Sequence, residues 1–225
     1  MFKHVFLDLD DTLLDFLLTE RDAISNTLRA FGKEPTEERI TTYSAINLET
    51  WERFERGEIP REQIFSERFV RLFSHYGWAI DPAAFNEVYR RELSLGHHLV
   101  PGAKELLDYL APKYHLYIAS NGTADTQDRR LSDANLTAYF DAVFISERVG
   151  SHKPEKDYFD ACFAAIPGFR HEEAILIGDS LSSDILGAAN AGITSCWFNY
   201  RRKPKRDDIV PDFTVFSLDE VKMIL

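Results

Sequence analysis

Six short apolar runs, most of them separated by segments of helical length, constrain the fold of this 225-residue chain more than any other feature. Their near-continuous apolarity is typical of strands that are buried on both faces. Such a pattern predicts an α/β fold, with a doubly wound, mostly parallel sheet that is covered by helices. The predicted strands are His4–Asp8, Leu116–Ser120, Ala142–Ser146, Ala174–Gly178, Thr194–Asn199 and Phe213–Phe216.

The segment between the first two predicted strands interrupts this alternation, because residues 15–98 contain no convincing strand and are rich in helix formers and charge. We expect an inserted α-helical cap domain here, and an α/β core domain made of residues 1–14 and 99–225. Ligands of open α/β sheets bind outside the carboxyl ends of the strands, so the cap is expected to cover that end. The predicted helices are Leu18–Phe31, Thr36–Gly57 with a break, Pro60–Tyr76 and Pro82–Leu95.

Composition limits the kinds of partner and the cellular compartment that we expect for this protein. The formal net charge of −11 argues against binding to nucleic acid, which is recognised by clustered Lys and Arg. We interpret the one basic run, Arg201–Arg206, as a solvated loop. Cys162 and Cys196 lie in apolar stretches, as in a reducing compartment. No secretory signal or membrane-spanning stretch is evident, so we expect a cytoplasmic protein that does not bind membranes.

Acidic residues follow the first predicted strand, in the order Asp8-Leu9-Asp10-Asp11-Thr12. Several carboxylates at the end of a buried strand repel one another unless they meet a cation or take up protons. Taken alone, an acidic strand end is more often a turn or a helix cap. The interpretation therefore depends on the other strand ends.

Three further strand ends carry polar residues. Ser120 and Asn121 end the second strand and, with Gly122, form either an ordinary turn or an anion-binding loop. Lys153 precedes Pro154, which is suited to begin a helix, and a lone lysine there is usually solvated. Asp179 ends the fourth strand, and Asp184 follows at the start of a helix. Together with the first strand end, these residues supply the carboxylates that a hard cation such as Mg²⁺ requires.

In this order, the four segments resemble the four motifs of the haloacid dehalogenase superfamily, and the resemblance covers essentially the whole chain. It implies a Rossmann-like core, with Asp8 as the nucleophile that becomes phosphorylated. It also implies that Asp10 first protonates the leaving oxygen and then activates water as a base. Mg²⁺ would be held by Asp8, the Asp10 carbonyl, Asp179 and Asp184.

The remaining motif residues have implied roles in binding the phosphoryl group. Ser120 and Asn121 bind it, while Lys153 neutralises its charge and orients Asp8. The presence of Asp10 favours phosphoryl transfer, because dehalogenases of this superfamily have no acid at that position. A phosphonatase would use a cap lysine, and the only lysine between Asp15 and His98 is Lys33, in a Gly-Lys-Glu-Pro turn.

These features predict a Mg²⁺-dependent phosphomonoesterase, a phosphoric monoester hydrolase that acts on small soluble phosphate esters. The motifs and the helical cap resemble most closely the branch that contains pyrimidine nucleoside 5′-monophosphatases, so a 5′-nucleotidase is favoured. Sugar-phosphate and acylneuraminate-phosphate phosphatases have nearly the same motifs and remain alternatives. A phosphomutase-type phosphotransferase would use the same residues, and a non-catalytic binding module is the remaining possibility. The exact substrate, the cap residues that set specificity, the oligomeric state and the pathway are open.

Overall fold

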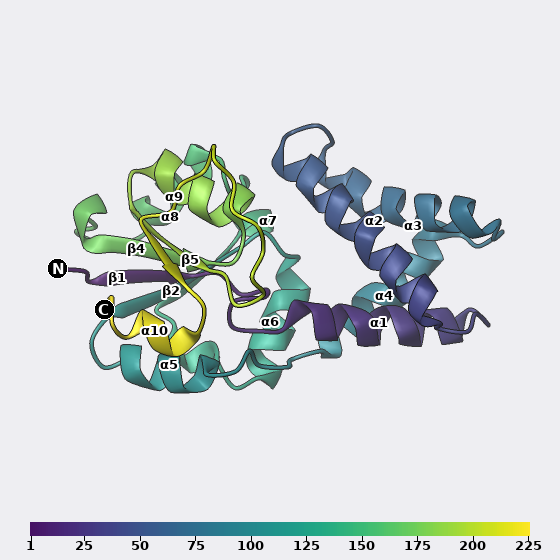
Figure 1. The fold of residues 1–225 in the computed structure, drawn as a ribbon, viewed down its shortest axis with the longest axis horizontal. Coiled ribbons are helices and arrows are strands. Elements are labelled where there is room, and N and C mark those ends of the chain that lie inside the picture. Colours follow the sequence, from purple (N-terminus) through teal and green to yellow (C-terminus); the bar gives the residue numbers. More distant parts are fainter. The chain divides into compact units, whose positions relative to one another are not determined.

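The computed structural model describes residues 1–225 and divides into two compact units. One unit, here called the core unit, consists of Met1–Phe16 and His97–Leu225, and the other, the helical unit, of Leu17–Gly96. The chain leaves the core unit soon after its first strand and returns about eighty residues later, as the colour gradient along the ribbon shows (Figure 1).

Six parallel strands form the sheet of the core unit, in the order β3-β2-β1-β4-β5-β6. Their bounds are β1 His4–Leu7, β2 His115–Ser120, β3 Ala142–Ile145, β4 Ala174–Gly178, β5 Thr194–Phe198 and β6 Phe213–Val215. All six strands coincide with the predicted ones to within one residue at each end. The predicted α/β fold class, a doubly wound parallel sheet, is thereby confirmed. The strand order reverses between β1 and β4, and the carboxyl ends of strands at such a switch point form the usual ligand-binding crevice.

Helices cover both faces of this sheet (Figure 1). Alternate side chains of a strand point to opposite faces, so Val5 and Leu7 pack in one apolar cluster and Phe6 in another. The helices of the core unit are α5 Ala103–Leu110, α6 Ala124–Asp133, α7 Ser146–Val149, α8 Lys156–Ala164, α9 Leu186–Ala191 and α10 Leu218–Val221. The first cluster includes residues of α5, α6 and α10, and the second includes residues of α8 and α9.

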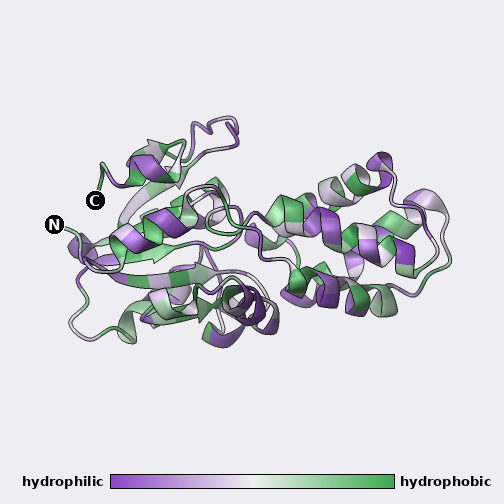
Figure 2. Cartoon of the chain, turned by 90° about the horizontal axis from the view of Figure 1, so that it is seen from below, coloured by the Kyte–Doolittle hydropathy of each residue, from purple (hydrophilic) through white to green (hydrophobic).

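Four helices make up the helical unit: α1 Phe16–Ala30, α2 Glu37–Glu55, α3 Arg61–Tyr76 and α4 Pro82–Leu95. Green and purple residues alternate along them, as expected of amphipathic helices with one buried side (Figure 2). Aromatic rings form the centre of the bundle, with Tyr43 stacked on Phe69 at 5.6 Å between ring centroids. The predicted break within Thr36–Gly57 is wrong, because α2 is continuous. Its start is capped by Thr36, whose hydroxyl accepts the Arg39 N–H.

Two further observations bear on the expected environment of the chain. No helix combines the length and apolarity needed to cross a bilayer. Cys162 and Cys196 are both free and buried.

Candidate active site

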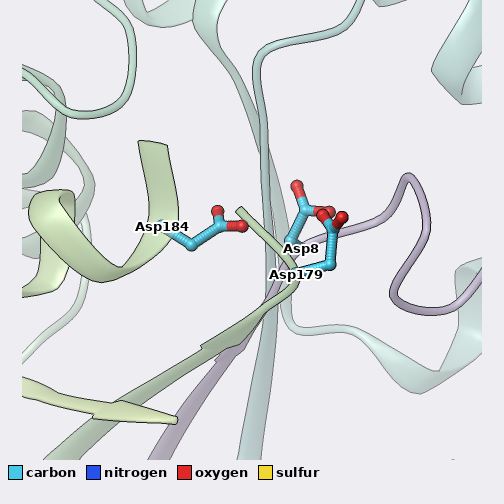
Figure 3. A group of neighbouring side chains, drawn as sticks. All are labelled: Asp8, Asp179 and Asp184. Carbon is cyan, nitrogen blue, oxygen red and sulfur yellow. The ribbon is translucent and has the colours of Figure 1, made fainter. Parts of the chain in front are cut away.

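The switch point between β1 and β4 brings three carboxylates together. Asp8 follows β1 directly, Asp179 follows β4, and Asp184 lies in the π-helical turn Leu181–Ile185. One oxygen atom of each carboxylate lies within 4.8 Å of the others, and all three residues are buried. The three carboxylates point into the same space (Figure 3). Sequence reasoning placed Asp8 and Asp179 at strand ends and Asp184 at the start of a helix, and the structure joins them in one cluster.

Because glycine has no side chain, Gly178 allows Asp184 to lie close to the sheet. A Cβ atom built on Gly178 would lie 2.3 Å from the Asp184 carboxylate, which is shorter than any real contact. The backbone N–H of Ser180 donates to Asp184 Oδ2 at 3.0 Å, and the Ser180 hydroxyl accepts the Ser183 N–H at 3.2 Å. The last residue of β4 and the turn after it therefore fix the position of the third carboxylate.

Lys153 provides a buried positive charge to this cluster. Its ammonium group donates to Asp8 Oδ1 at 2.7 Å, to Asp184 Oδ1 at 2.6 Å and to the Ala119 carbonyl at 2.5 Å, so that all three of its N–H donors are used. Burial alone would lower the Lys153 pKa, but the charges of Asp184 and Asp8 outweigh burial and raise the pKa above its ordinary value. Lys153 is therefore a permanent cation in this site.

Two of the carboxylates in the cluster have pKa values above the ordinary value of an aspartate. Burial raises the pKa of Asp8 well above its ordinary value; Lys153 opposes this rise, and the neighbouring carboxylates of Asp184 and Asp179 add to it. Burial likewise raises the pKa of Asp179 to about 6, against the opposing charge of Lys203. Both shifts mean that the cluster would gain stability from a further positive charge.

Ser120 and Asn121 lie beside the cluster, at the end of β2. The Asn121 amide bonds to the backbone of Lys153 twice, with Nδ2 donating to the Lys153 carbonyl at 2.8 Å and Oδ1 accepting the Lys153 N–H at 2.9 Å. Asn121 therefore fixes the segment that carries the buried lysine. The Ser120 hydroxyl oxygen accepts the Gly122 N–H at 3.1 Å.

The side chain of Asp10 is not part of the carboxylate cluster. Two residues of α6, Gln127 and Arg130, hydrogen bond to its two carboxylate oxygens. Sequence reasoning did not single out either residue. The available signal was the spacing of Ala124 and Leu131, which marks the buried side of α6 and places Gln127 on it. Of the predicted metal ligands, Asp10 was expected to act through its backbone carbonyl, and that expectation stays a prediction.

The interpretation of Arg201–Arg206 as a solvated loop is wrong for two of its residues. Arg201 donates to Asp11 Oδ1 at 3.0 Å and to Asp15 Oδ1 at 2.8 Å. Lys203 donates to Asp179 Oδ2 at 2.5 Å. Local sequence could not reveal these ion pairs, because they depend on the path of the loop after β5, which brings it back over the acidic strand ends. This loop therefore contributes two cations to the edge of the site.

Comparison with known proteins identifies the family. The model of the haloacid dehalogenase-like hydrolases matches residues 5–198, so the chain belongs to this family and the predicted superfamily is confirmed. One relative, YfnB from Bacillus subtilis, is described as a HAD-hydrolase; it is 37% identical over 100% of this chain and 95% of its own length. The crystal structure of YfnB was solved with bound magnesium. It superposes on this chain with a TM-score of 0.96, and the alignment covers 100% of this chain and 98% of the YfnB chain.

Two other relatives are named for their activity. The pyrimidine 5′-nucleotidase PynA from Streptococcus pneumoniae is 34% identical over 98% of this chain and 93% of its own length. The pyrimidine 5′-nucleotidase YjjG from Escherichia coli is 31% identical over 98% of this chain and 96% of its own length. Each alignment spans nearly the full length of both proteins.

Proposed function

We propose that this hydrolase is a Mg²⁺-dependent phosphomonoesterase that acts through an aspartyl phosphate on Asp8. The observation that carries the proposal is the buried cluster of Asp8, Asp179 and Asp184, in which Asp8 is held by Lys153 at 2.7 Å. The relatives support the enzyme class, a phosphoric monoester hydrolase, since two of them are named 5′-nucleotidases. A small phosphate ester is the proposed substrate, and the cytoplasm is the proposed location.

The residues present fit a magnesium ion. Three buried carboxylates within 4.8 Å of one another offer the oxygen ligands that Mg²⁺ prefers. Burial raises the pKa values of Asp8 and Asp179, so their ionised forms would be stabilised by a bound cation. Asp8, Asp179 and Asp184 would hold the ion, together with the Asp10 carbonyl. When bound, it would neutralise the carboxylates and polarise a phosphoryl oxygen.

The protein's own residues account for the remaining chemistry. A carboxylate oxygen of Asp8 attacks phosphorus, the bond to the ester oxygen breaks, and Asp10 gives that oxygen a proton. Water then attacks the aspartyl phosphate, gives a proton to Asp10 and releases phosphate, which restores the Asp8 carboxylate. Lys153 and Ser120 stabilise the charge on the phosphoryl oxygens. Asn121 holds the backbone of Lys153 in place, and we propose that the Asn121 amide also binds the phosphoryl group.

Nucleoside 5′-monophosphates are the proposed substrate class, and the naming of PynA and YjjG as pyrimidine 5′-nucleotidases supports it. The test is phosphate release with Mg²⁺ from a panel of nucleoside monophosphates, sugar phosphates and p-nitrophenyl phosphate. We expect nucleoside monophosphates to give the highest kcat/KM. A preference for sugar phosphates would support the alternative substrate class, and transfer of the phosphoryl group to an added sugar, rather than to water, would indicate a phosphotransferase.

The role of Asp8 is tested with Asp8→Asn, which keeps the size of the side chain but removes the attacking oxyanion. We expect the rate of phosphate release from p-nitrophenyl phosphate to fall by about 10³-fold or more. Asp160→Asn is the matched control, because Asp160 is an exposed acid on α8 that pairs only with Lys156. Wild-type turnover by the Asp8 variant would refute the nucleophile assignment.

A further inference from the structure

Helix α6 presents two buried polar side chains to Asp10. Gln127 and Arg130 are each only 1% exposed. Gln127 Nε2 donates to Asp10 Oδ2 at 2.6 Å and to Ser120 Oγ at 2.9 Å. Arg130 donates to Asp10 Oδ1 and, at 2.9 Å, to Gln127 Oε1. The three side chains thus form a closed ring of hydrogen bonds, to which Ser120 is attached through Gln127.

We propose that Gln127 and Arg130 are positioning residues: they fix the carboxyl group of Asp10 for proton transfer and turn the Ser120 hydroxyl into a hydrogen-bond donor for the phosphoryl group. This inference rests on the proposed phosphomonoesterase function. It extends that function by two residues that lie outside the four recognised motifs, on a helix that follows the second motif.

The bonds to Ser120 define what its hydroxyl can do. A hydroxyl group has two acceptor positions and one proton to donate. The oxygen of Ser120 accepts from the Gly122 N–H at 3.1 Å and from Gln127 at 2.9 Å, which uses both acceptor positions. The remaining direction belongs to the O–H bond, which suits an anionic phosphoryl oxygen. Gln127 therefore sets the direction in which Ser120 donates.

The bonds to Asp10 fix both of its oxygens. Arg130 is almost fully buried, and a buried guanidinium requires a nearby counter-charge, which Asp10 supplies. With one donor on each oxygen, the carboxyl plane has little freedom to rotate. A catalytic carboxyl that is misplaced by about 1 Å loses much of its effect, because proton transfer requires hydrogen-bond geometry.

The backbone around α6 is adapted to this arrangement. A Cβ atom on Gly122 would lie 2.3 Å from Gln127 Nε2, so the amide of Gln127 packs directly on the Gly122 backbone. The first turn of α6 is held in place by Glu147, whose carboxylate accepts the Ala124 N–H at 2.7 Å. Gly122→Ala should therefore push the Gln127 amide away from Asp10 without removing any functional group.

The experiment compares two leaving groups in full-length enzyme with Mg²⁺. The 4-nitrophenolate of p-nitrophenyl phosphate leaves without a proton, whereas an alkoxide requires one from Asp10. The second substrate is the alkyl phosphate that wild-type enzyme cleaves fastest in the panel described above. For Gln127→Leu and Arg130→Met we expect kcat/KM to fall by about 10²-fold for the alkyl ester and by at most about tenfold for the nitrophenyl ester.

Conservative variants and a double-mutant cycle with Asp10 distinguish positioning of Asp10 by Gln127 and Arg130 from a merely structural role. Arg130→Lys should retain more alkyl-ester activity than Arg130→Met, and Arg129→Met on the exposed side of the same helix should match wild type. In an Asp10→Asn background, Gln127→Leu should no longer change the ratio of kcat/KM for the two esters, because the carboxyl group that Gln127 positions is gone.

Two outcomes would overturn the inference. One is an equal loss of kcat/KM for both esters in the Gln127→Leu variant. The other is a change in the ratio of the two kcat/KM values when Gln127→Leu is made in the Asp10→Asn background. If Arg130→Met does not fold, as judged by circular dichroism, the Gln127→Leu and Gly122→Ala variants decide alone. Failure of the wild-type enzyme to hydrolyse either ester would instead refute the proposed function, and the inference with it.

Discussion

Replacing Lys153 by Met should reveal how much of the core unit's stability depends on one buried cation. The Lys153 side chain is 1% exposed, and its ammonium group bonds to Asp8 at 2.7 Å and to Asp184 at 2.6 Å. The side chains of these two partners are 9% and 1% exposed. Removing one partner of a buried ion pair costs about 3–5 kcal/mol, because the remaining charge has no compensation. Here two carboxylates lose their partner, so we expect a loss at the upper end of that range, out of a typical domain stability of about 5–15 kcal/mol.

The measurement is urea unfolding followed by circular dichroism at neutral pH, first with EDTA and then with Mg²⁺. Because the variant has one more uncompensated negative charge in the cluster, added Mg²⁺ should stabilise it more than it stabilises wild type. Lys156→Met is the control, since Lys156 pairs with Asp160 at the surface and should change stability by less than about 0.5 kcal/mol. A Lys153 variant within about 1 kcal/mol of wild type in EDTA would refute the reasoning.

Two further predictions concern the competition of other cations for Asp179. Lys203 pairs with Asp179, but its side chain is 45% exposed, so Lys203→Gln should tighten Mg²⁺ binding only about two- to fivefold in calorimetry. Lys205→Gln is the control, and weaker binding by the Lys203 variant would contradict the idea of competition. Because the pKa of Asp179 is raised to about 6, this group takes up a proton as the pH falls through that value. Mg²⁺ must then displace the proton, so its apparent affinity should be about tenfold lower at pH 5 than at pH 7, and equal affinities would contradict the shift.

Local sequence was sufficient to locate the residues that end strands. Asp8 and Asp179 follow apolar runs directly, and parallel neighbouring strands bring their carboxyl ends to the same edge of a sheet. The sequence predicted the sheet, and the structure shows that β1 and β4 are neighbours within it. Ser120, which was predicted to end a strand, lies at the same edge because β2 is the other neighbour of β1.

Contacts made by long side chains could not be predicted in this way. Arg201 and Lys203 reach the acidic site from an irregular loop, whose path is not encoded by any periodic pattern. Arg130 lies in a helix with a strongly polar sequence, where an arginine is normally solvated. Its burial depends on the exact approach of α6 to the end of β1, which brings Asp10 within hydrogen-bonding distance. Tertiary geometry, rather than residue type, decides these contacts.

The central position of β1 has a consequence for the order in which the chain can fold. His4 pairs with His115 of β2 on one side and with Ala174 of β4 on the other, so β1 has no neighbouring strand until the chain has been synthesised beyond the helical unit. The helical unit, which is encoded between them and has its own apolar core, is complete before either neighbour has been synthesised. We therefore expect a nascent chain to carry a finished helical bundle behind an unpaired apolar strand, a stage at which chaperones would find their clearest target.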